Sequence, residues 1–355
     1  MNYLVYLHSI GFSHKLLHKI FEKEKNYKSF YEELSSTVLK KYVDKEEQID
    51  KILHLKNTLN ISEIDKKIEK LGIQIIPHYD INYPKLLKNI SHTPYFLYVR
   101  GELKGDDNFF SVVGSRKMSL YAKKAGESIL PKLMEYFTIV SGGAGGCDTL
   151  AHQICLDKNA KTIVVFGTGI DIIYPSGNKK LFQKVIEKSG ALISIFPLGT
   201  LGNIYTFPVR NEIVAGLSSG LLVLEASQKS GTLITANLAL EQSKEVFAIP
   251  GDIFAENYMG ANSLIQKGEA KLVQNAEDIL QEYGYKILPS QKEIHFENEI
   301  QENIYTLLKY NLGLSIDEFI EKSQYEYGLL AFNLSYMELQ NLIKKDAFGK
   351  YQIMH

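Results

Sequence analysis

Residues 139–152 read IVSGGAGGCDTLAH, and this stretch decides the fold. The apolar residues before Ser141 predict a strand, and the four glycines between Gly142 and Gly146 predict a tight turn. A helical pattern follows, and we expect Asp148 to cap that helix. Strand, glycine turn and helix in this order are typical of a parallel sheet with helices on its faces.

The same unit repeats along the chain from about residue 105 to 285. The runs are almost continuously apolar, as expected for strands that helices cover on both sides, and their alternation with helices implies right-handed crossovers. We therefore predict a doubly wound α/β domain, to which two apolar runs within 73–101 add one or two strands. The further strand segments are FFSVVGSR (109–116), KTIVVFGTG (161–169), ALISIF (191–196), SGLLVLEA (219–226) and EVFAIPG (245–251).

Two smaller segments flank this domain. Residues 1–70 repeat apolar positions at helical spacing and predict a small helical domain. Residues 286–299 are polar without periodicity and predict a linker. Residues 300–355 predict three helices and a short β-element, the winged-helix pattern, which is used for DNA binding or as a protein-docking module.

The composition excludes several classes of protein. A net charge of −1 does not suggest nucleic acid, although a local basic surface is compatible with it. No apolar run approaches the roughly 20 residues that span a membrane, and no signal peptide is evident, so we expect a cytoplasmic protein. Cys147 and Cys155 are eight apart, which matches neither a zinc knuckle nor a disulfide framework. We predict buried thiols, with no metal and no cofactor.

Arginine is rare, whereas lysine supplies nearly all other positive charges. The three arginines are Arg100, Arg116 and Arg210. A planar guanidinium grips phosphate through two hydrogen bonds, where lysine offers a point charge. We therefore predict that Arg116 and Arg210 hold an anion and that Arg100 lies at the surface.

The glycine-rich turns all follow predicted strands. In an open α/β sheet, ligands bind outside the carboxyl ends of the strands, and helix N-termini attract anions there. Asp148, Asn211 and the GTL segment at 231–233 are at predicted helix starts. The second turn has no lysine for a Walker A loop, and no dinucleotide fingerprint follows the first strand. Ser115, Ser141 and Ser230 have no matched histidine, so we assign no catalytic residue.

The ordered set of motifs resembles the DprA/Smf family of bacterial DNA-processing proteins. The match runs from VVGSRKMSLYAKKA through the opening stretch, YPSGN, FPVRNEIVAGLS and EASQKSGTLITANLALE to VFAIPG and MGANSLIQKGEA, and covers roughly residues 73–280. The resemblance implies an extended Rossmann-like, mostly parallel sheet, a SAM-like or helix-hairpin-helix N-terminal domain and a C-terminal winged helix. It implies a binding protein, not an enzyme, with single-stranded DNA, RecA recombinase and a second copy of the chain as partners, and no membrane.

The family motifs map onto this chain residue by residue. Three family arginines are replaced, by Gly145, Glu212 and Lys229, which predicts weaker phosphate binding and a shallower salt dependence. Combined with the turns above, the predicted single-stranded DNA and phosphate-binding residues are Gly114, Ser115, Arg116, Ser141, Gly142, Gly143, Gly146, Asp148, Lys179, Lys180, Phe207, Arg210, Asn211, Lys229, Ser230, Gly231 and Thr232.

Two other functions remain open. The core also looks like the LOG or lysine-decarboxylase-like phosphoribohydrolases, which hold a nucleoside monophosphate. However, SGTLITA (230–236) lacks their preceding proline and glycines and the glutamate that follows. A RecA-docking or regulatory scaffold, with secondary DNA binding, is the third possibility.

Overall fold

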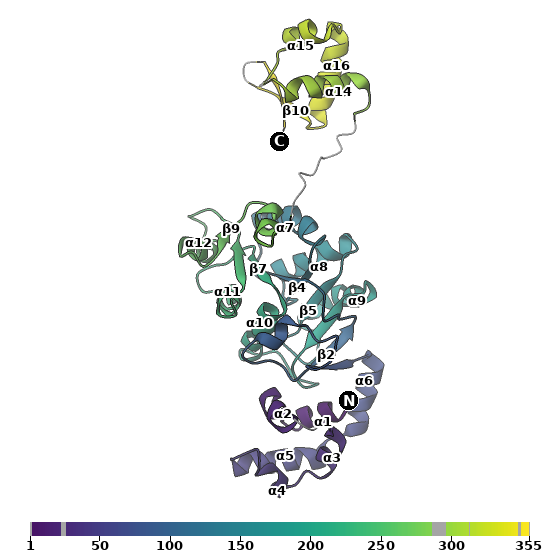
Figure 1. Ribbon diagram of the computed structural model, residues 1–355, viewed down its shortest axis with the longest axis vertical. Helices are drawn as coiled ribbons and strands as arrows, with labels where there is room; N and C mark the ends of the chain where they lie inside the picture. Colours follow the sequence, from purple (N-terminus) through teal and green to yellow (C-terminus); the bar gives the residue numbers. More distant parts are fainter. Residues whose placement is uncertain (1, 23–25, 286–295, 312, 347–348, 355) are drawn as a thin grey trace. The chain divides into compact units, whose positions relative to one another are not determined.

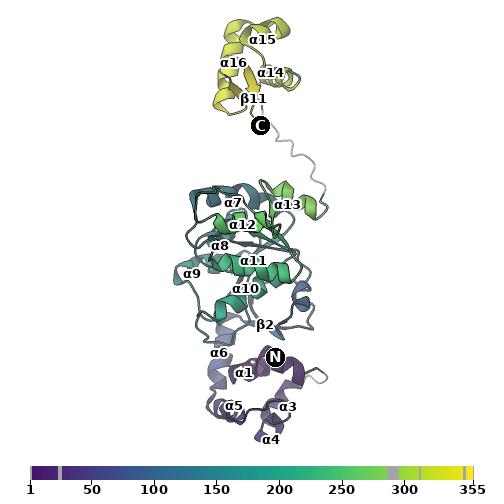
Figure 2. The same cartoon turned by 90° about the vertical axis from the view of Figure 1, so that its left-hand side faces the viewer.

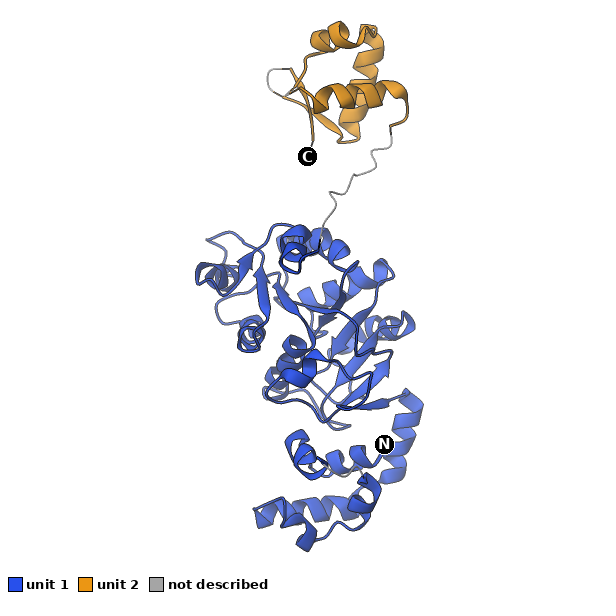
Figure 3. Ribbon diagram, viewed as in Figure 1, with its two compact units in different colours: residues 1–286 blue, residues 287–355 orange. Residues whose placement is uncertain are grey.

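The computed structural model describes residues 2–22, 26–285, 296–311, 313–346 and 349–354. The chain forms two compact units, residues 1–286 and 287–355 (Figure 3). Most of the predicted linker, 286–299, lies outside the described residues. Within the described part of the chain, no helix is both long and apolar enough to cross a membrane.

The first unit is built on a twisted sheet to which its described residues contribute nine strands in the order β1-β2-β6-β5-β4-β3-β7-β8-β9. All neighbours from β6 to β9 are parallel, whereas β2 is antiparallel to both β1 and β6. The sheet thus confirms the predicted mostly parallel α/β fold. The strands are β1 (Gln74–Pro77), β2 (Phe96–Gly101), β3 (Phe109–Val113), β4 (Thr138–Ser141), β5 (Thr162–Val165), β6 (Ala191–Ser194), β7 (Gly220–Val223), β8 (Glu245–Ala248) and β9 (Lys271–Leu272).

Helices cover both faces of the sheet, which is why its central strands are buried along their whole length. One face carries α7 (Leu120–Leu133), α8 (Cys147–Asp157) and α9 (Lys179–Glu187); the other carries α10 (Thr206–Leu217), α11 (Gly231–Glu241) and α12 (Met259–Gln266) (Figures 1 and 2). Helix α13 (Ala276–Glu282) is the last described helix of this unit and contacts α7. From β3 the chain adds β4, β5 and β6 on one side of β3. It then crosses back and adds β7, β8 and β9 on the other side, so the strand order reverses between β3 and β7.

The N-terminal helices pack against the antiparallel edge of this sheet and share a hydrophobic core with it. His8 Nδ1 hydrogen-bonds to the Tyr98 hydroxyl (2.9 Å) and His14 Nε2 donates to the Ile195 carbonyl (2.8 Å). The 3-10 helix η1 (Leu86–Asn89) lies between β1 and β2. The N-terminal helices are α1 (Asn2–Ser9), α2 (His14–Ile20), α3 (Tyr27–Glu32), α4 (Ser36–Leu39), α5 (Glu46–Thr58) and α6 (Ile61–Leu71).

Arg100 is not the surface residue that the sequence predicted. Its side chain is half-buried on β2, and its Nε donates to the Leu71 carbonyl at the end of α6 (3.1 Å). The last carbonyls of a helix have no partner within the helix, so a donor placed there satisfies one of them. Arg100 therefore joins the N-terminal helices to the sheet.

The second unit has the predicted order of three helices and a β-hairpin. The elements are α14 (Glu299–Lys309), α15 (Ile316–Ser323), α16 (Tyr327–Leu339) and the antiparallel strands β10 (Ile343–Lys345) and β11 (Tyr351–Ile353). Leu314, which precedes α15, forms an additional bridge to Tyr351. Winged helix remains our interpretation of this arrangement.

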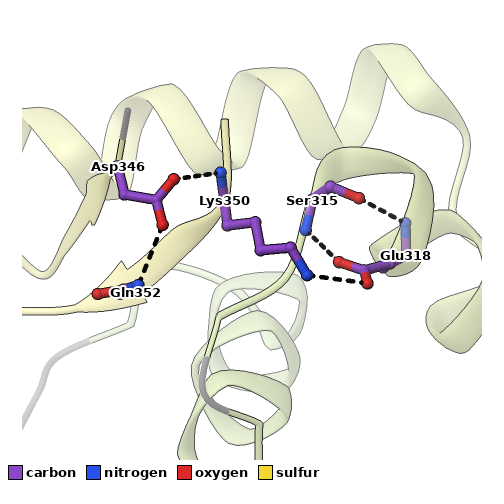
Figure 4. Close-up of polar contacts among 5 residues, drawn as sticks. All are labelled: Ser315, Glu318, Asp346, Lys350 and Gln352. Carbon is purple, nitrogen blue, oxygen red and sulfur yellow. Dashed lines mark hydrogen bonds and ion pairs between the residues drawn. The ribbon is translucent and has the colours of Figure 1, made fainter. Parts of the chain in front are cut away.

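A polar network holds the hairpin of the second unit to α15 (Figure 4). Ser315 and Glu318 form a capping box, in which each side chain accepts a hydrogen bond from the backbone N–H of the other. The Lys350 ammonium lies 3.2 Å from the Glu318 carboxylate, so a charge on the hairpin is paired with the start of α15.

Candidate nucleic-acid interface

A hollow of about 420 Å³ lies at the carboxyl edge of the sheet, at the reversal between β3 and β7. This is the position where open α/β sheets bind ligands. The turns after β3 and β4 and the first turns of α10 and α11 supply its walls. The lining includes eleven of the predicted binding residues: Gly114, Ser115, Arg116, Gly142, Asp148, Phe207, Arg210, Asn211, Ser230, Gly231 and Thr232.

Arg116 and an aromatic ring form the open side of the hollow. The exposed Arg116 guanidinium lies 5.4 Å from the centre of the half-buried Phe207 ring. The Tyr174 ring, itself 49% exposed, lies 5.6 Å from Phe207. A guanidinium over an aromatic face is held in place by a cation–π attraction while its outer N–H groups stay available.

Arg210 lies at the bottom of the hollow and is only 5% exposed. Its Nη1 donates to the Gly142 carbonyl and to the Val165 carbonyl (2.8 Å), and its Nε donates to Asn211 Oδ1 (3.0 Å). Burial lowers the pKa of Arg210, while the nearby Asp148 carboxylate acts in the opposite direction. Arg210 therefore ties α10 to the ends of β4 and β5, a position quite different from that of Arg116.

Gly142 is required by this arrangement. A Cβ at Gly142 would lie only 2.4 Å from Nη1 of Arg210, so any side chain there would displace the guanidinium. Gly142 thus leaves the space in which the guanidinium of Arg210, 68 residues away in sequence, is buried.

Asp148 does not cap α8, contrary to the prediction. The N-cap is Gly146, and Asp148 is already inside the helix, where its Oδ2 accepts from the Ala144 N–H of the preceding turn (3.2 Å). Gly146 has φ of 75°, and a Cβ there would lie 2.2 Å from the Ser115 carbonyl oxygen. The positive φ and the close carbonyl both favour glycine at this N-cap, which therefore has no side chain to cap the helix. Burial raises the pKa of Asp148, and Arg210 opposes that rise.

Helix α10 begins at Thr206 and not, as predicted, near Arg210. Pro208 lies in its first turn, where proline is tolerated because that N–H has no helical partner. Asn203 Oδ1 accepts from the N–H groups of Tyr205 (2.8 Å) and Thr206 (3.1 Å). The correction moves Asn211 away from the helix start. The signal that could have revealed this is Asn203 followed by Pro208.

The start of α11 matches the prediction and remains open to a ligand. Ser230 is the N-cap, but its side chain makes no capping hydrogen bond, and the helix begins at Gly231. The N–H groups of a first helical turn need partners from outside the helix. Because they face the hollow with the positive end of the helix dipole, they favour an anion. Sequence reasoning missed the apolar wall beside them, formed by Ile204 and Ile234.

The other predicted residues do not line the hollow. Ser141 is fully buried and donates to the Val112 carbonyl (2.7 Å), and Gly143 accepts from Asn178 Nδ2 (3.0 Å). Both residues hold the second turn in place, as does Gly146. The exposed lysines Lys179, Lys180 and Lys229 lie next to residues of the turns but not in the hollow itself.

Gly145 and Glu212, which stand where the family has arginines, have contrasting surroundings. A Cβ at Gly145 would meet only the Arg116 carbonyl oxygen, at 3.8 Å, so this position has space. Glu212 instead lies 3.0 Å from His92 Nδ1, against the segment before β2. Among the described residues, Asp148 is the one carboxylate that lines the hollow.

The two cysteines are buried on α8, as predicted, and His152 is buried between them on the same helix. Burial raises the pKa of both thiols to about 12, which keeps them protonated. The described residues include no group of three histidine, cysteine, aspartate or glutamate side chains suited to a metal ion.

Comparison with known proteins identifies the family. Residues 74–284 of this chain match the model of the family named DNA recombination-mediator protein A. Protein Smf of Escherichia coli is 39% identical over 241 residues, which cover 67% of this chain and 64% of Smf. DNA processing protein DprA of Streptococcus pneumoniae is 41% identical over 206 residues, 57% of this chain and 72% of DprA.

Solved structures agree with the sequence matches. The X-ray structure of DprA from Streptococcus pneumoniae aligns with a TM-score of 0.69 at 32% identity, over 81% of this chain and 99% of that one. DNA processing protein A from Helicobacter pylori, described for its single-stranded DNA binding mode, aligns with a TM-score of 0.54 at 26% identity, over 60% of this chain and 96% of that one. The matched region contains the whole sheet and the hollow, and the chain belongs to the DNA recombination-mediator protein A family.

Proposed function

We propose that this protein binds single-stranded DNA in the hollow and acts as a recombination mediator. In this proposal it protects incoming DNA and loads RecA onto the strand during natural transformation, as a cytoplasmic homodimer. The observation that carries the binding function is the exposed Arg116 over the Phe207 ring, opposite the uncapped start of α11. The hollow therefore combines two groups that favour phosphate with an aromatic surface beside Arg116.

The residues divide this work between them. Arg116 and the N–H groups at the start of α11 hold phosphate oxygens through charge-assisted hydrogen bonds. The Tyr174 ring, which is 49% exposed, offers a face on which a base can stack, for roughly 1–3 kcal/mol per base, while the neighbouring Phe207 ring holds the Arg116 guanidinium. A base in a duplex is already stacked and paired, so this arrangement favours a single strand. Lys179, Lys180 and Lys229 extend the positive charge beyond the hollow.

Binding rather than catalysis fits the polar groups of the hollow. Asp148 accepts a hydrogen bond from the Ala144 N–H of the turn and lies near the buried Arg210. Its carboxylate therefore stabilises the fold and is not assigned an acid–base role. Asp171 lies 3.2 Å from Lys67, and Glu212 lies against His92, so neither faces the hollow. The shared family, and the Helicobacter pylori protein whose structure is described for its single-stranded DNA binding mode, support the same proposal.

A titration of single-stranded and duplex oligonucleotides of equal length, at several salt concentrations, tests the proposal. We expect tighter binding of the single strand and an affinity that falls with salt, because phosphate contacts release counterions. Equal affinity for both forms would contradict it. Release of free base from AMP or GMP by the same preparation would instead support the phosphoribohydrolase alternative. RecA filament formation on coated DNA tests the loading function separately.

A further inference from the structure

Helix α16 (Figure 1) has a second apolar face, which no described residue of the second unit covers. Its inner face, with Leu330, Leu334 and Met337, packs into the core of the unit. Phe332 and Leu339, in contrast, are 66% and 82% exposed. In a stable domain an exposed apolar face of this kind marks an interaction site.

The outward residues follow the spacing of a helix-packing seam. Leu329, Phe332, Tyr336 and Leu339 are separated by three, four and three positions, so they form one stripe along the helix. The Phe332 and Tyr336 rings are stacked, with centroids 6.3 Å apart. An aromatic and leucine stripe on a rigid helix is the kind of surface that packs against another amphipathic helix.

The charges around α16 exclude the usual DNA-reading role of the third helix in a winged-helix domain. Helix α16 contains no lysine or arginine, and its one charged residue is Glu338. Over the described residues of this unit, nine carboxylates outnumber five lysines. Lys350 is paired with Glu318 (Figure 4). Phosphate binding needs a surplus of cations, whereas the described part of this unit has a surplus of carboxylates, and its exposed lysines nearest the end of α16, Lys344 and Lys345, belong to β10 and not to α16.

We propose that the outward face of α16 docks an amphipathic helix of a protein partner, one whose apolar residues are flanked by lysines or arginines. Glu326 precedes the stripe, Glu338 lies within its last turn, and Tyr336 hydrogen-bonds to Glu297. Carboxylates around an apolar centre complement a basic rim on the partner. A second copy of this unit would bring like charges together, which disfavours self-association through this face.

The test uses the full chain and a synthetic helical peptide with leucines at heptad positions and lysines beside them. We expect this peptide to bind, the affinity to fall with salt, and a roughly tenfold loss in the Phe332→Ala and Leu339→Lys variants. Tyr310→Ala is the matched control, because Tyr310 is 80% exposed at the end of α14, outside the stripe. It should bind like the wild type. Circular dichroism melting checks that each variant is folded.

Several results would overturn the proposal. A peptide with glutamates in place of the lysines, or with scrambled leucine positions, should not bind; equal binding means that the face is not selective. A loss of duplex-DNA affinity in Phe332→Ala would make α16 a DNA-reading helix. Dissociation of a dimer by Leu339→Lys, seen by sedimentation, would make a second copy the occupant. Single-stranded DNA binding by Phe332→Ala should be unchanged, so the failure of either proposal can be recognised separately.

Discussion

The floor and the rim of the hollow each contain one arginine, and the two arginines have different surroundings. We define the floor as the buried residues Gly142, Asp148 and Arg210, and the rim as Arg116 and the adjacent Gly145. Both guanidinium groups lie near the Phe207 ring, at 5.4 Å for Arg116 and 5.8 Å for Arg210, but Arg210 is buried and donates to backbone carbonyls, whereas Arg116 is exposed. The comparison indicates that the floor maintains the fold and the rim meets the ligand. Burial, and not residue type, separates the two roles.

The largest expected effect is on stability, from Arg210→Ala. The change leaves the carbonyls of Gly142 and Val165 and the Asp148 carboxylate without their donor or neighbouring cation. An unsatisfied buried polar group costs about 1–3 kcal/mol, so we expect the free energy of unfolding to fall by about 3 kcal/mol. Urea unfolding measures this. A stable variant that loses only DNA affinity would place Arg210 in the rim and break the comparison.

The pH dependence of stability tests the buried surroundings of the floor through His152. The Thr162 hydroxyl donates to the Ile139 carbonyl (2.8 Å), so His152 Nδ1 must donate to Thr162 Oγ1 (2.7 Å). His152 Nε2 has no partner among the described residues. A proton on Nε2 would thus be buried without an acceptor. Burial, helped by the charge of Arg210, lowers the pKa of His152 to about 3.

The direction in which stability changes with pH follows from the lowered pKa of His152. The unfolded chain binds a proton on His152 near pH 6.5, whereas the folded chain does so only near pH 3. Stability is therefore lost as the pH falls below about 6.5, by about 2 kcal/mol at pH 5. Unfolding at pH 7 and pH 5 should show a smaller difference in His152→Gln, whose side chain does not titrate. An identical difference in both proteins would mean that other groups control the acid response.

The sequence predicts the sheet, the edge at which ligands bind and the presence of both arginines at that edge. These features depend on local periodicity and on general topology, which a single chain carries in its residue pattern. The burial of Arg210 depends instead on how α10 closes over β4 and β5, and on the absence of a side chain at Gly142. Such contacts between distant elements cannot be deduced from the local periodicity of the residues. The predicted start of α10 is wrong for a different reason: the helical periodicity is clear only from Arg210, whereas the helix begins at Thr206 with Pro208 in its first turn.

Arg116→Ala tests the rim. The exposed guanidinium contributes little to stability, so unfolding should be unchanged, while single-stranded DNA affinity falls about tenfold at moderate salt. Losing one phosphate contact should also reduce the slope of log affinity against log salt by about 0.7. Anisotropy titrations at several salt concentrations measure both. Lys117→Ala, also exposed but outside the hollow, is the control and should have a smaller effect. Unchanged binding in Arg116→Ala would remove the rim from the interface.

Gly145→Arg is expected to have the smallest effect and sharpens the comparison most, because it adds a cation to the rim. A Cβ there meets only the Arg116 carbonyl oxygen, at 3.8 Å, and the glycine does not have a positive φ, so the backbone accepts a side chain. We expect roughly threefold tighter single-stranded DNA binding and a salt slope steeper by about 0.7.

Glu212→Arg is the matched control for charge, because it introduces an arginine at another position where the family has one. Glu212 lies 3.0 Å from His92, outside the hollow, so the new cation would meet the segment before β2 and not the DNA. It should therefore leave the affinity almost unchanged and lower stability slightly. If Glu212→Arg tightened binding while Gly145→Arg did not, the DNA path would follow the first turns of α10 and not the turn between β4 and α8.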